Sequence, residues 1–456
     1  MTDAASRVAT AAAAWIGGRL PGMRASAGLS IVGSVYEVIG TDVMARLPLG
    51  RLGMLCVIER VGATGQSGES LLAEVVGFSA EGVRLTAMGS LQNVGPGDQV
   101  RVVATEHFVT AGPHLCGDVL DAYGRSLTGG VGAFALGAPS VGSRRVLQGI
   151  HGALDRKPIS QPFTTGVRAL DGLMTIGRGQ RVGIFAGPGC GKTTLLSAIA
   201  QGCAADYVVF GLIGERGREL QEFAHEMQSS PLAARLVIVA ASSDRSSLER
   251  ARAAATATTV AEALAAGGHS VLLLIDSLTR YARAQREIGI AAGEPPGRGG
   301  FPPSFYTSLP RLVERAGNFT DGCITAIYTV LSEQDLEADP VADETRSLLD
   351  GHIVLSRKLA EAGHYPAIDV LRSLSRTMGS VVASSQSAAA RRVRKAMARH
   401  EALDFLIKVG EYKPGRVADD DAAVDAEPGI KAFLQQDLGI RADFDDTVGH
   451  LHGLVA

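Results

Sequence analysis

Apolar positions in the first part of the chain come in short runs that glycine and turn residues interrupt. Between Ser26 and Glu106 these runs of five or six residues recur at regular spacing, with turn signals such as the G-P-G-D at 95–98. No helical periodicity separates them. The pattern is typical of a small closed or nearly closed β-barrel. It carries no visible catalytic chemistry, so we expect it to act as a scaffold or a subunit contact.

The spacing of apolar residues changes after a connector, rich in glycine and proline, that runs from roughly Gly112 to Gly177. Beyond Gln180, apolar strands alternate with segments of helical periodicity. This alternation predicts an α/β domain with a predominantly parallel sheet covered on both faces, and ligands bind such sheets at the carboxyl ends of the strands. The expected strands are Val182–Ala186, Tyr207–Ile213, Leu236–Ala240, Val271–Ile275 and Ile324–Leu331.

From about Ser380 onward the pattern predicts helices. A helix over Ala388–Lys408 would place apolar residues on one side and a basic cluster on the remaining surface, which we interpret as a solvated face. An acidic linker is expected at Asp419–Glu427, followed by a last helical segment near Ile430–Gln436. The basic cluster consists of Arg391, Arg392, Arg394, Lys395 and Arg399.

The alanine-rich run Val8–Ile16 lacks the basic flank of a secretory signal and predicts a short amphipathic helix. The expected parts of the chain are an N-terminal helical segment at 1–25, a β-barrel domain at 26–106, a sheet domain at 107–379 and a C-terminal helical domain at 380–456.

The composition limits the possible classes of protein but does not indicate a function. The 456 residues are 46% hydrophobic, enough for sizeable cores, and a net charge of −3 gives no general reason to expect a nucleic-acid partner. The five cysteines have neither disulfide-framework nor zinc-site spacing, which favours a reducing cytoplasm. No run approaches the 18 apolar residues that a membrane-spanning helix requires.

A phosphate-binding motif lies where the first strand of the sheet domain meets a helix. Residues 182–196 read V-G-I-F-A-G-P-G-C-G-K-T-T-L-L. Glycines let backbone N–H groups face phosphate oxygens, Lys192 would reach the β- and γ-phosphates, and the Thr193 hydroxyl would coordinate Mg²⁺. Ala186 replaces the first glycine of the motif, and a simple glycine turn is the alternative. The expected nucleotide-binding residues are Gly187, Gly189, Cys190, Gly191, Lys192, Thr193 and Thr194.

Two carboxylates follow other predicted strands. Asp276 comes directly after the apolar run V-L-L-L-I, where a phosphate-loop enzyme holds Mg²⁺; the alternative role is a helix N-cap. Glu215 follows V-V-F-G-L-I-G and could polarise the attacking water. Glu219 is the runner-up, and a charged helix start is the alternative interpretation of this segment.

Several segments together closely resemble the type III secretion ATPases, which are related to the catalytic subunit of rotary ATP synthases. They are the phosphate-loop segment from Thr165 to Leu196, G-L-I-G-E-R-G-R-E, D-S-L-T-R-Y-A-R-A-Q-R-E-I-G-I-A-A-G-E-P-P and P-V-A-D-E-T-R-S-L-L-D-G-H-I-V-L-S-R-K-L. The resemblance covers the chain from about residue 26 to its C-terminal end. It implies a RecA-like ATPase core between an N-terminal β-barrel and a C-terminal helical domain, which makes 107–379 the nucleotide-binding domain. It also implies ATP and Mg²⁺ as cofactors and a homohexameric ring with nucleotide at each subunit interface.

The resemblance also implies roles for individual residues. Lys192, Thr193 and Asp276 match the phosphate-loop lysine and the magnesium-associated groups, Glu215 matches the catalytic carboxylate, and Arg216 is its neighbour in the G-E-R motif. In H-Y-P-A-I-D-V-L-R-S-L-S-R, the family pattern gives Tyr365 as an aromatic that packs on adenine and Arg376 as an arginine finger for the adjacent subunit. Tyr412, in K-V-G-E-Y-K, can form the other wall of the adenine pocket. Arg372 stands where relatives have a small residue, so the choice between Arg372 and Arg376 stays open.

The family resemblance further implies partners and a location. We expect central stalk and stator proteins, export chaperone–cargo complexes, and peripheral contact with the export gate at the cytoplasmic face of the inner membrane. The injectisome ATPase is favoured over the flagellar export ATPase. A cargo-docking platform with incidental hydrolysis is a further alternative. A hexameric RNA translocase is disfavoured because residues 26–106 contain only Tyr36 and Phe78 as stacking aromatics.

Overall fold

The structure is a computed structural model that describes residues 31–40, 42–61, 67–135, 142–147, 152–332, 339–437 and 439–454. The segment 1–25, with the helix expected at Val8–Ile16, lies outside the described residues. The described residues up to His107 form one compact unit, and those from Phe108 onward form another.

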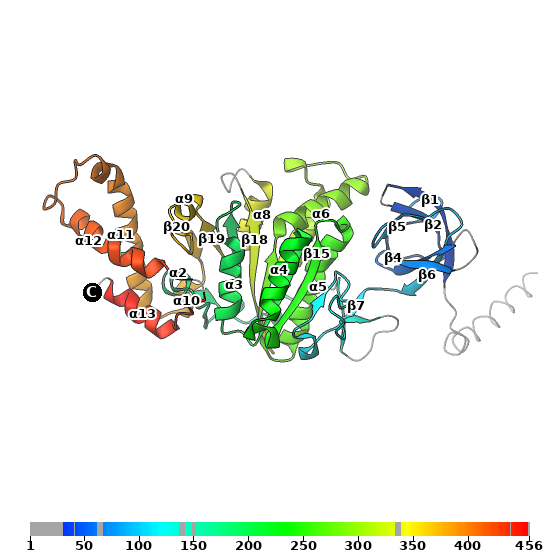
Figure 1. Ribbon diagram of the computed structural model, residues 1–456, viewed down its shortest axis with the longest axis horizontal. Helices are drawn as coiled ribbons and strands as arrows, with labels where there is room; N and C mark the ends of the chain where they lie inside the picture. The colour runs from blue at the N-terminus through cyan, green and yellow to red at the C-terminus, as the bar shows by residue number, and fades with distance from the viewer. Residues whose placement is uncertain are drawn as a thin grey trace, which may run out of the picture. The chain divides into compact units, whose positions relative to one another are not determined.

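The first unit is a closed antiparallel barrel, as the apolar runs predict (Figure 1). The strand order is β1-β2-β5-β4-β3-β6, and β1 closes the barrel by pairing with β6. In β5 the alternate residues Val83, Leu85 and Ala87 are buried in the barrel core, as a period of two requires. The strands are β1 (Val32–Ile39), β2 (Asp42–Arg46), β3 (Leu55–Val61), β4 (Ser67–Phe78), β5 (Val83–Ala87) and β6 (Gln99–Ala104).

The second unit is built on a sheet that runs in the order β20-β19-β13-β18-β16-β14-β15-β8 in the part of the chain that the structure describes. Neighbouring strands are parallel except for the edge pair β19 and β20 and the short β17 beside β18. The strands are β13 (Arg181–Ala186), β14 (Tyr207–Glu215), β15 (Leu236–Ser242), β16 (Ser270–Asp276), β17 (Gly317–Asn318), β18 (Cys323–Leu331), β19 (Gly351–Leu355) and β20 (Ile368–Ser375). All five strands expected from the sequence are confirmed, and each is longer than expected by one to two residues.

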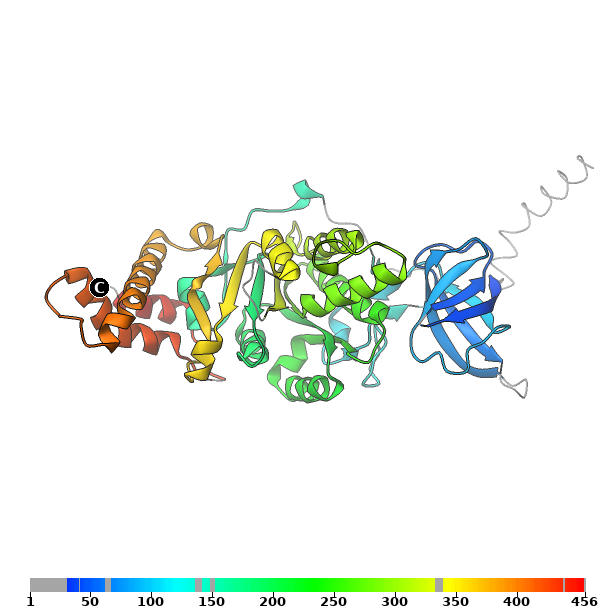
Figure 2. The same ribbon diagram turned by 90° about the horizontal axis from the view of Figure 1, so that it is seen from above.

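Helices cover both faces of this sheet (Figure 2). They are α3 (Lys192–Gly202), α4 (Gly217–Gln228), α5 (Ser247–Ala266), α6 (Leu278–Ala291), α7 (Pro303–Val313), α8 (Pro340–Leu348) and α9 (Arg357–Glu361), with 3-10 turns at Pro231–Arg235 and Arg298–Gly300. The start of α5 is set by a capping box. The Ser246 hydroxyl accepts from the Glu249 N–H at 3.2 Å, and the Glu249 carboxylate accepts from the Ser246 N–H at 3.1 Å.

The glycine-rich connector contributes short elements to the second unit. They are β7 (Phe108–Thr110), β8 (Val119–Leu120), β9 (Phe134–Ala135), β10 (Ser143–Arg145), β11 (Pro162–Phe163), α2 (Arg168–Leu173) and β12 (Ile176–Gly177), with 3-10 turns at Pro113–Leu115 and Ala153–Asp155. Strand β8 extends the main sheet by pairing in parallel with β15. The connector is therefore part of the sheet domain rather than only a wrapping around it.

The C-terminal part is helical, with α10 (Met378–Val381), α11 (Ser384–Lys408), α12 (Ala418–Leu434) and α13 (Phe444–Gly453). The predicted acidic linker at Asp419–Glu427 is wrong, since those residues form the first half of α12. Three aspartates in its first turn suit the positive end of the helix dipole. Two of them, Asp419 and Asp420, also pair with Lys395 and Arg399 of α11. The segment expected near Ile430–Gln436 is the end of α12, and α13 was not expected.

The basic cluster on α11 is therefore only partly a solvated face. Besides the two pairs with α12, the half-buried Arg394 donates to the Ser373 carbonyl of β20 at 2.8 Å. Among the helices in the described part of the chain, none combines the length and the hydrophobicity that a membrane span needs.

Candidate active site

The phosphate loop lies between the end of β13 at Ala186 and the start of α3 at Lys192. Gly189 and Gly191 each have a φ of +77°, a conformation that favours glycine. No side chain caps the start of α3, so its first N–H groups face outward for an anion. Thr193 and Thr194 are exposed there, Gly187 is half-buried and Cys190 is buried.

Two strand ends and the start of α3 bring charged residues together beside this loop. The Lys192 ammonium contacts the Asp276 carboxylate at the end of β16 and lies 3.9 Å from Glu215 Oε1 at the end of β14. Asp276 is only 2% exposed, and the Thr329 hydroxyl donates to it at 2.6 Å. The structure thus assembles Lys192, Glu215 and Asp276, which are far apart in the sequence, into one cluster.

Arg280 completes the cluster and was missed in the sequence analysis. Its guanidinium lies 3.0 Å from Glu215 Oε2 and also donates to the Gly214 carbonyl. Its Nε is buried without a hydrogen-bond partner. The signal that could have found it is its place in D-S-L-T-R, one helical turn beyond Asp276. The first turn of α6 carries Arg280, whose side chain reaches the end of β14.

Burial raises the pKa of the Glu215 carboxyl, and the negative charge of Asp276 raises it further. The cations of Lys192 and Arg280 oppose this shift. Glu215 is therefore a stronger base than an ordinary surface glutamate, while the two cations hold its side chain in place.

Arg216 and Glu219 point away from this cluster. The Arg216 side chain is 78% exposed at the N-cap of α4, and its guanidinium lies 3.5 Å from the exposed Glu219 carboxylate. The structure brings Glu215 rather than Glu219 to Lys192. Arg216 has no contact with the phosphate loop among the interactions of the described residues.

The two tyrosines lie in different surroundings. Tyr365 is 43% exposed. It lies beside the phosphate loop, since a Cβ placed on Gly191 would be 3.3 Å from Tyr365 Cε1. Tyr412 lies between α11 and α12, where its hydroxyl donates to Asp421 at 2.5 Å. That hydrogen bond raises the pKa of Tyr412 to about 12. Within the described residues Tyr412 makes no hydrogen bond to Tyr365 or the phosphate loop.

Arg372, in the edge strand β20, and Arg376, directly after it, are both exposed. The Arg376 backbone N–H donates to the Asp350 carbonyl at 3.0 Å. Arg372 lies in a bulge of β20, and its N–H donates to the Asp369 carboxylate at 3.1 Å. Neither guanidinium has a hydrogen bond or ion pair within the described residues.

The residues at the phosphate loop suit a hard cation. No group of three or more His, Cys, Asp and Glu side chains converges as a metal site in the described residues. Mg²⁺ instead binds through one or two protein oxygens together with substrate phosphates and water. The exposed Thr193 hydroxyl and the Asp276 carboxylate fit that donor set.

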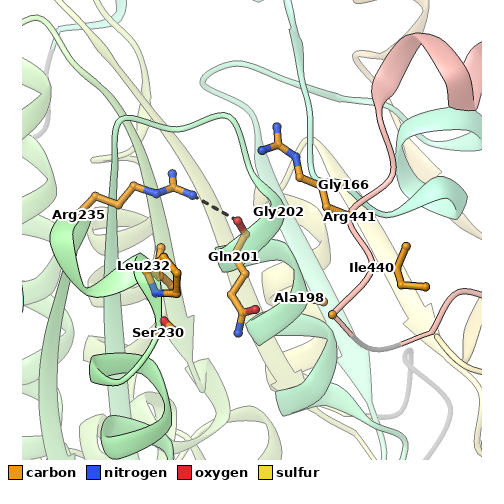
Figure 3. A pocket seen from close by; sticks show the side chains of 11 residues that line it. Gly166, Ala198, Gln201, Gly202, Ser230, Leu232, Arg235, Ile440 and Arg441 are labelled. Carbon is orange, nitrogen blue, oxygen red and sulfur yellow. Dashed lines mark hydrogen bonds between the residues drawn. The ribbon is translucent and has the colours of Figure 1, made fainter.

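A separate pocket of about 280 Å³ lies at the opposite end of α3, the helix that the phosphate loop begins (Figure 3). Gln201 and Gly202 line it together with Arg235 and Arg441. Arg235 donates to the Gln201 carbonyl at 3.4 Å, so this guanidinium is committed to the backbone. None of the residues expected for nucleotide binding lines this pocket.

Comparison with known proteins gives the same family over almost the whole chain. Residues 166–375 match the ATP synthase alpha/beta family, nucleotide-binding domain, and residues 382–453 match the T3SS EscN ATPase C-terminal domain. The Type 3 secretion system ATPase of Pseudomonas syringae pv. tomato is 50% identical over 92% of this chain and 93% of its own. The Flagellum-specific ATP synthase of Pseudomonas aeruginosa is 41% identical, with 93% of each chain covered.

Solved structures agree with the sequence relatives. The assembled ATPase EscN of the enteropathogenic E. coli type III secretion system matches with a TM-score of 0.84 and 42% identity, over 93% of this chain and all of that one. EscN in complex with its central stalk EscO matches equally well. The RecA-like fold class with a barrel and C-terminal helices is thereby confirmed, as are ATP binding and an ATP-hydrolysing activity. The chain belongs to the type 3 secretion system ATPases.

Proposed function

We propose that this ATPase hydrolyses ATP with the cluster of Lys192, Glu215, Asp276 and Arg280, in a homohexameric ring that completes each site with an arginine of the next subunit. The observation that carries the proposal is the convergence of these four charged side chains at the strand ends beside the uncapped start of α3.

Each residue then has one task. The N–H groups of the phosphate loop and Lys192 bind the β- and γ-phosphates. Glu215 orients and polarises the attacking water, and Arg280 acts as a positioning residue for Glu215. Thr193 and Asp276 would hold Mg²⁺, whose charge neutralises the phosphates. Tyr365 packs on adenine, while Tyr412 provides the second wall and Arg216 lines the mouth of the site in the assembled ring.

The ring and its partners rest on the relatives and on exposed residues. EscN is known in an assembled form and with a central stalk, so we infer a homohexamer around a stalk protein for this chain. The exposed Phe405 and Val409 near the end of α11 provide an apolar surface for export chaperone–cargo complexes. Turnover would drive chaperone release, unfolding and export at the cytoplasmic face of the inner membrane. There, stator proteins and the export gate hold the ring.

Specific ATPase activity should rise steeply with protein concentration, because a site that needs a neighbour's arginine exists only in the assembled ring. Activity and sedimentation measured over the same dilution series check this. Arg376→Ala is the control and should stay low at every concentration. A flat specific activity across a shift from monomer to hexamer would contradict the shared site.

Arg280→Ala should lower turnover and move the acid limb of its pH profile to higher pH. Arg280 lowers the pKa of Glu215, so removing its charge lets that pKa rise and protonates the base at a higher pH. A kcat–pH profile measures the shift. The control is Arg250→Ala, because the Arg250 guanidinium pairs with Glu287 rather than Glu215. An acid limb that stays in place would show that Arg280 does not act on Glu215.

A further inference from the structure

A fully buried glutamine lies at the start of the strand that carries the phosphate loop. Gln180 is 0% exposed and directly precedes β13. Its Oε1 accepts from the Gly177 N–H at 2.8 Å and from the Thr377 hydroxyl. Its Nε2 donates to the Asp350 carbonyl at 2.9 Å and lies 3.2 Å from the Ser375 hydroxyl. Every hydrogen-bonding atom of the amide therefore has a partner, as burial demands.

Three of these partners are next to Arg376, either in the sequence or through a backbone hydrogen bond. Ser375 precedes it, Thr377 follows it, and the Asp350 carbonyl that accepts from Gln180 also accepts from the Arg376 N–H at 3.0 Å. The Ser375 hydroxyl donates onward to the Thr175 carbonyl at 2.9 Å. Gln180 thus contacts both residues that flank Arg376 and the carbonyl that accepts from its N–H, while the Arg376 guanidinium remains exposed.

The surroundings leave little room for Gln180 to move. A Cβ on Gly351 would lie 3.0 Å from Gln180 Nε2 and 2.7 Å from the Leu374 carbonyl, so β19 must carry glycine there. Gly179 has a φ of +86°, and a Cβ on it would lie 2.6 Å from Asn318. The turn that presents Gln180 is fixed by the same close packing.

We infer that Gln180 is a positioning residue for Arg376 and joins it to β13, the strand that ends at the subunit's own phosphate loop. This inference rests on the proposed function, in which Arg376 serves the next subunit. Strand β13 spans only Arg181–Ala186, so the loop of one site and the finger for the adjacent site are held by two ends of one strand.

The test compares Gln180→Met with Gln386→Met. Gln386 is also a buried glutamine, and its Nε2 donates to the Asp171 carbonyl at 3.0 Å and to Thr175 Oγ1 at 3.1 Å, but it does not contact Ser375, Thr377 or Asp350. Gln180→Met should lower kcat by about 10²-fold, because small misplacements of a catalytic group have effects of that size. Binding of a fluorescent ATP analogue to the variant's own phosphate loop should change little. Gln386→Met should lose similar thermal stability and keep its kcat.

Thr377→Val provides a second, milder variant, because Thr377 is only half-buried whereas Gln180 is fully buried. It removes one hydrogen bond to Gln180 and should lower kcat by about two- to tenfold. Placed on Arg376→Ala, either Gln180→Met or Thr377→Val should cause no further loss, because a positioning residue has nothing left to position. A full additional loss in that background, or wild-type kcat for Gln180→Met, would overturn the inference alone. Wild-type turnover by Arg376→Ala would overturn the finger assignment and the inference with it.

Discussion

A Glu215→Gln protein should bind ATP with nearly wild-type affinity while its turnover falls by about 10² to 10⁴-fold, the usual contribution of a general base. The amide keeps the shape of the side chain and an oxygen for the Arg280 guanidinium, which lies 3.0 Å from Glu215 Oε2. It cannot take a proton from water. Single-turnover hydrolysis and nucleotide binding, measured on the same sample, separate the two effects.

Two other variants test whether the effect is specific to Glu215. Lys192→Ala should lose phosphate engagement itself, so its nucleotide affinity should fall together with turnover. Glu219→Gln should hydrolyse ATP normally, because Glu219 is exposed and paired with Arg216 away from Lys192. If Glu215→Gln turned over at the wild-type rate while Glu219→Gln did not, the base would be Glu219.

The same protein separates an export motor from a docking platform. If turnover drives chaperone release, Glu215→Gln should still bind a chaperone–cargo complex and fail to dissociate it. Equal release by the variant and the wild type would favour docking with incidental hydrolysis.

The core of the site was predictable because strand ends obey a simple rule. Asp276 and Glu215 each follow a continuous apolar run, and parallel neighbours bring such residues to one edge of the sheet. Lys192 was predictable from its spacing to the glycines of the phosphate-binding motif. How close these residues lie to one another could not be predicted from the sequence, because strand order decides which strand ends are adjacent. The order β13-β18-β16-β14 becomes visible only in the fold.

Arg280 and Gln180 escaped the sequence analysis for a different reason. Each acts through contacts with residues distant in the chain: Arg280 lies against Glu215, and Gln180 lies against Ser375 and Thr377. An arginine in an amphipathic helix and a glutamine in a glycine turn have ordinary local patterns. The place of Arg280 one helical turn beyond Asp276 was a signal for it, whereas only the packing distinguishes Gln180 from a surface residue.

The acidic stretch of α12 shows how local charge can mislead. Asp419–Glu427 carries five acidic residues and is followed directly by Pro428 and Gly429, so its pattern favours a linker. The helix forms there because α12 packs against α11 with Ala423 buried, and because acidic residues suit a helix start. The surface pairs of Asp419 and Asp420 with α11 add little. Its stability is therefore tertiary, which a reading of residue spacing cannot detect.

Arg376→Ala and Lys192→Ala should each be nearly inactive alone, and mixing the two should restore part of the activity. Loss of an arginine finger costs such enzymes about 10³ to 10⁵ in rate. In a mixed ring, an Arg376→Ala subunit contributes an intact Lys192, and its Lys192→Ala neighbour contributes an intact Arg376. One kind of interface then has every group it needs. ATPase activity measured against the mixing ratio, after co-assembly, checks this.

The same mixing experiment decides between the two arginines of β20. If Arg376 is the finger, Arg372→Ala alone should hydrolyse ATP normally. In that case, mixing Arg372→Ala with Lys192→Ala measures how many intact sites a ring needs for turnover. Both guanidiniums are exposed, but only the backbone of Arg376 is held by the buried Gln180 network, while Arg372 lies in a bulge fixed by Asp369. A finger must keep its position while nucleotide comes and goes, which favours Arg376. If Arg372→Ala is inactive and is rescued by Lys192→Ala, while Arg376→Ala is fully active, the finger is Arg372 rather than Arg376.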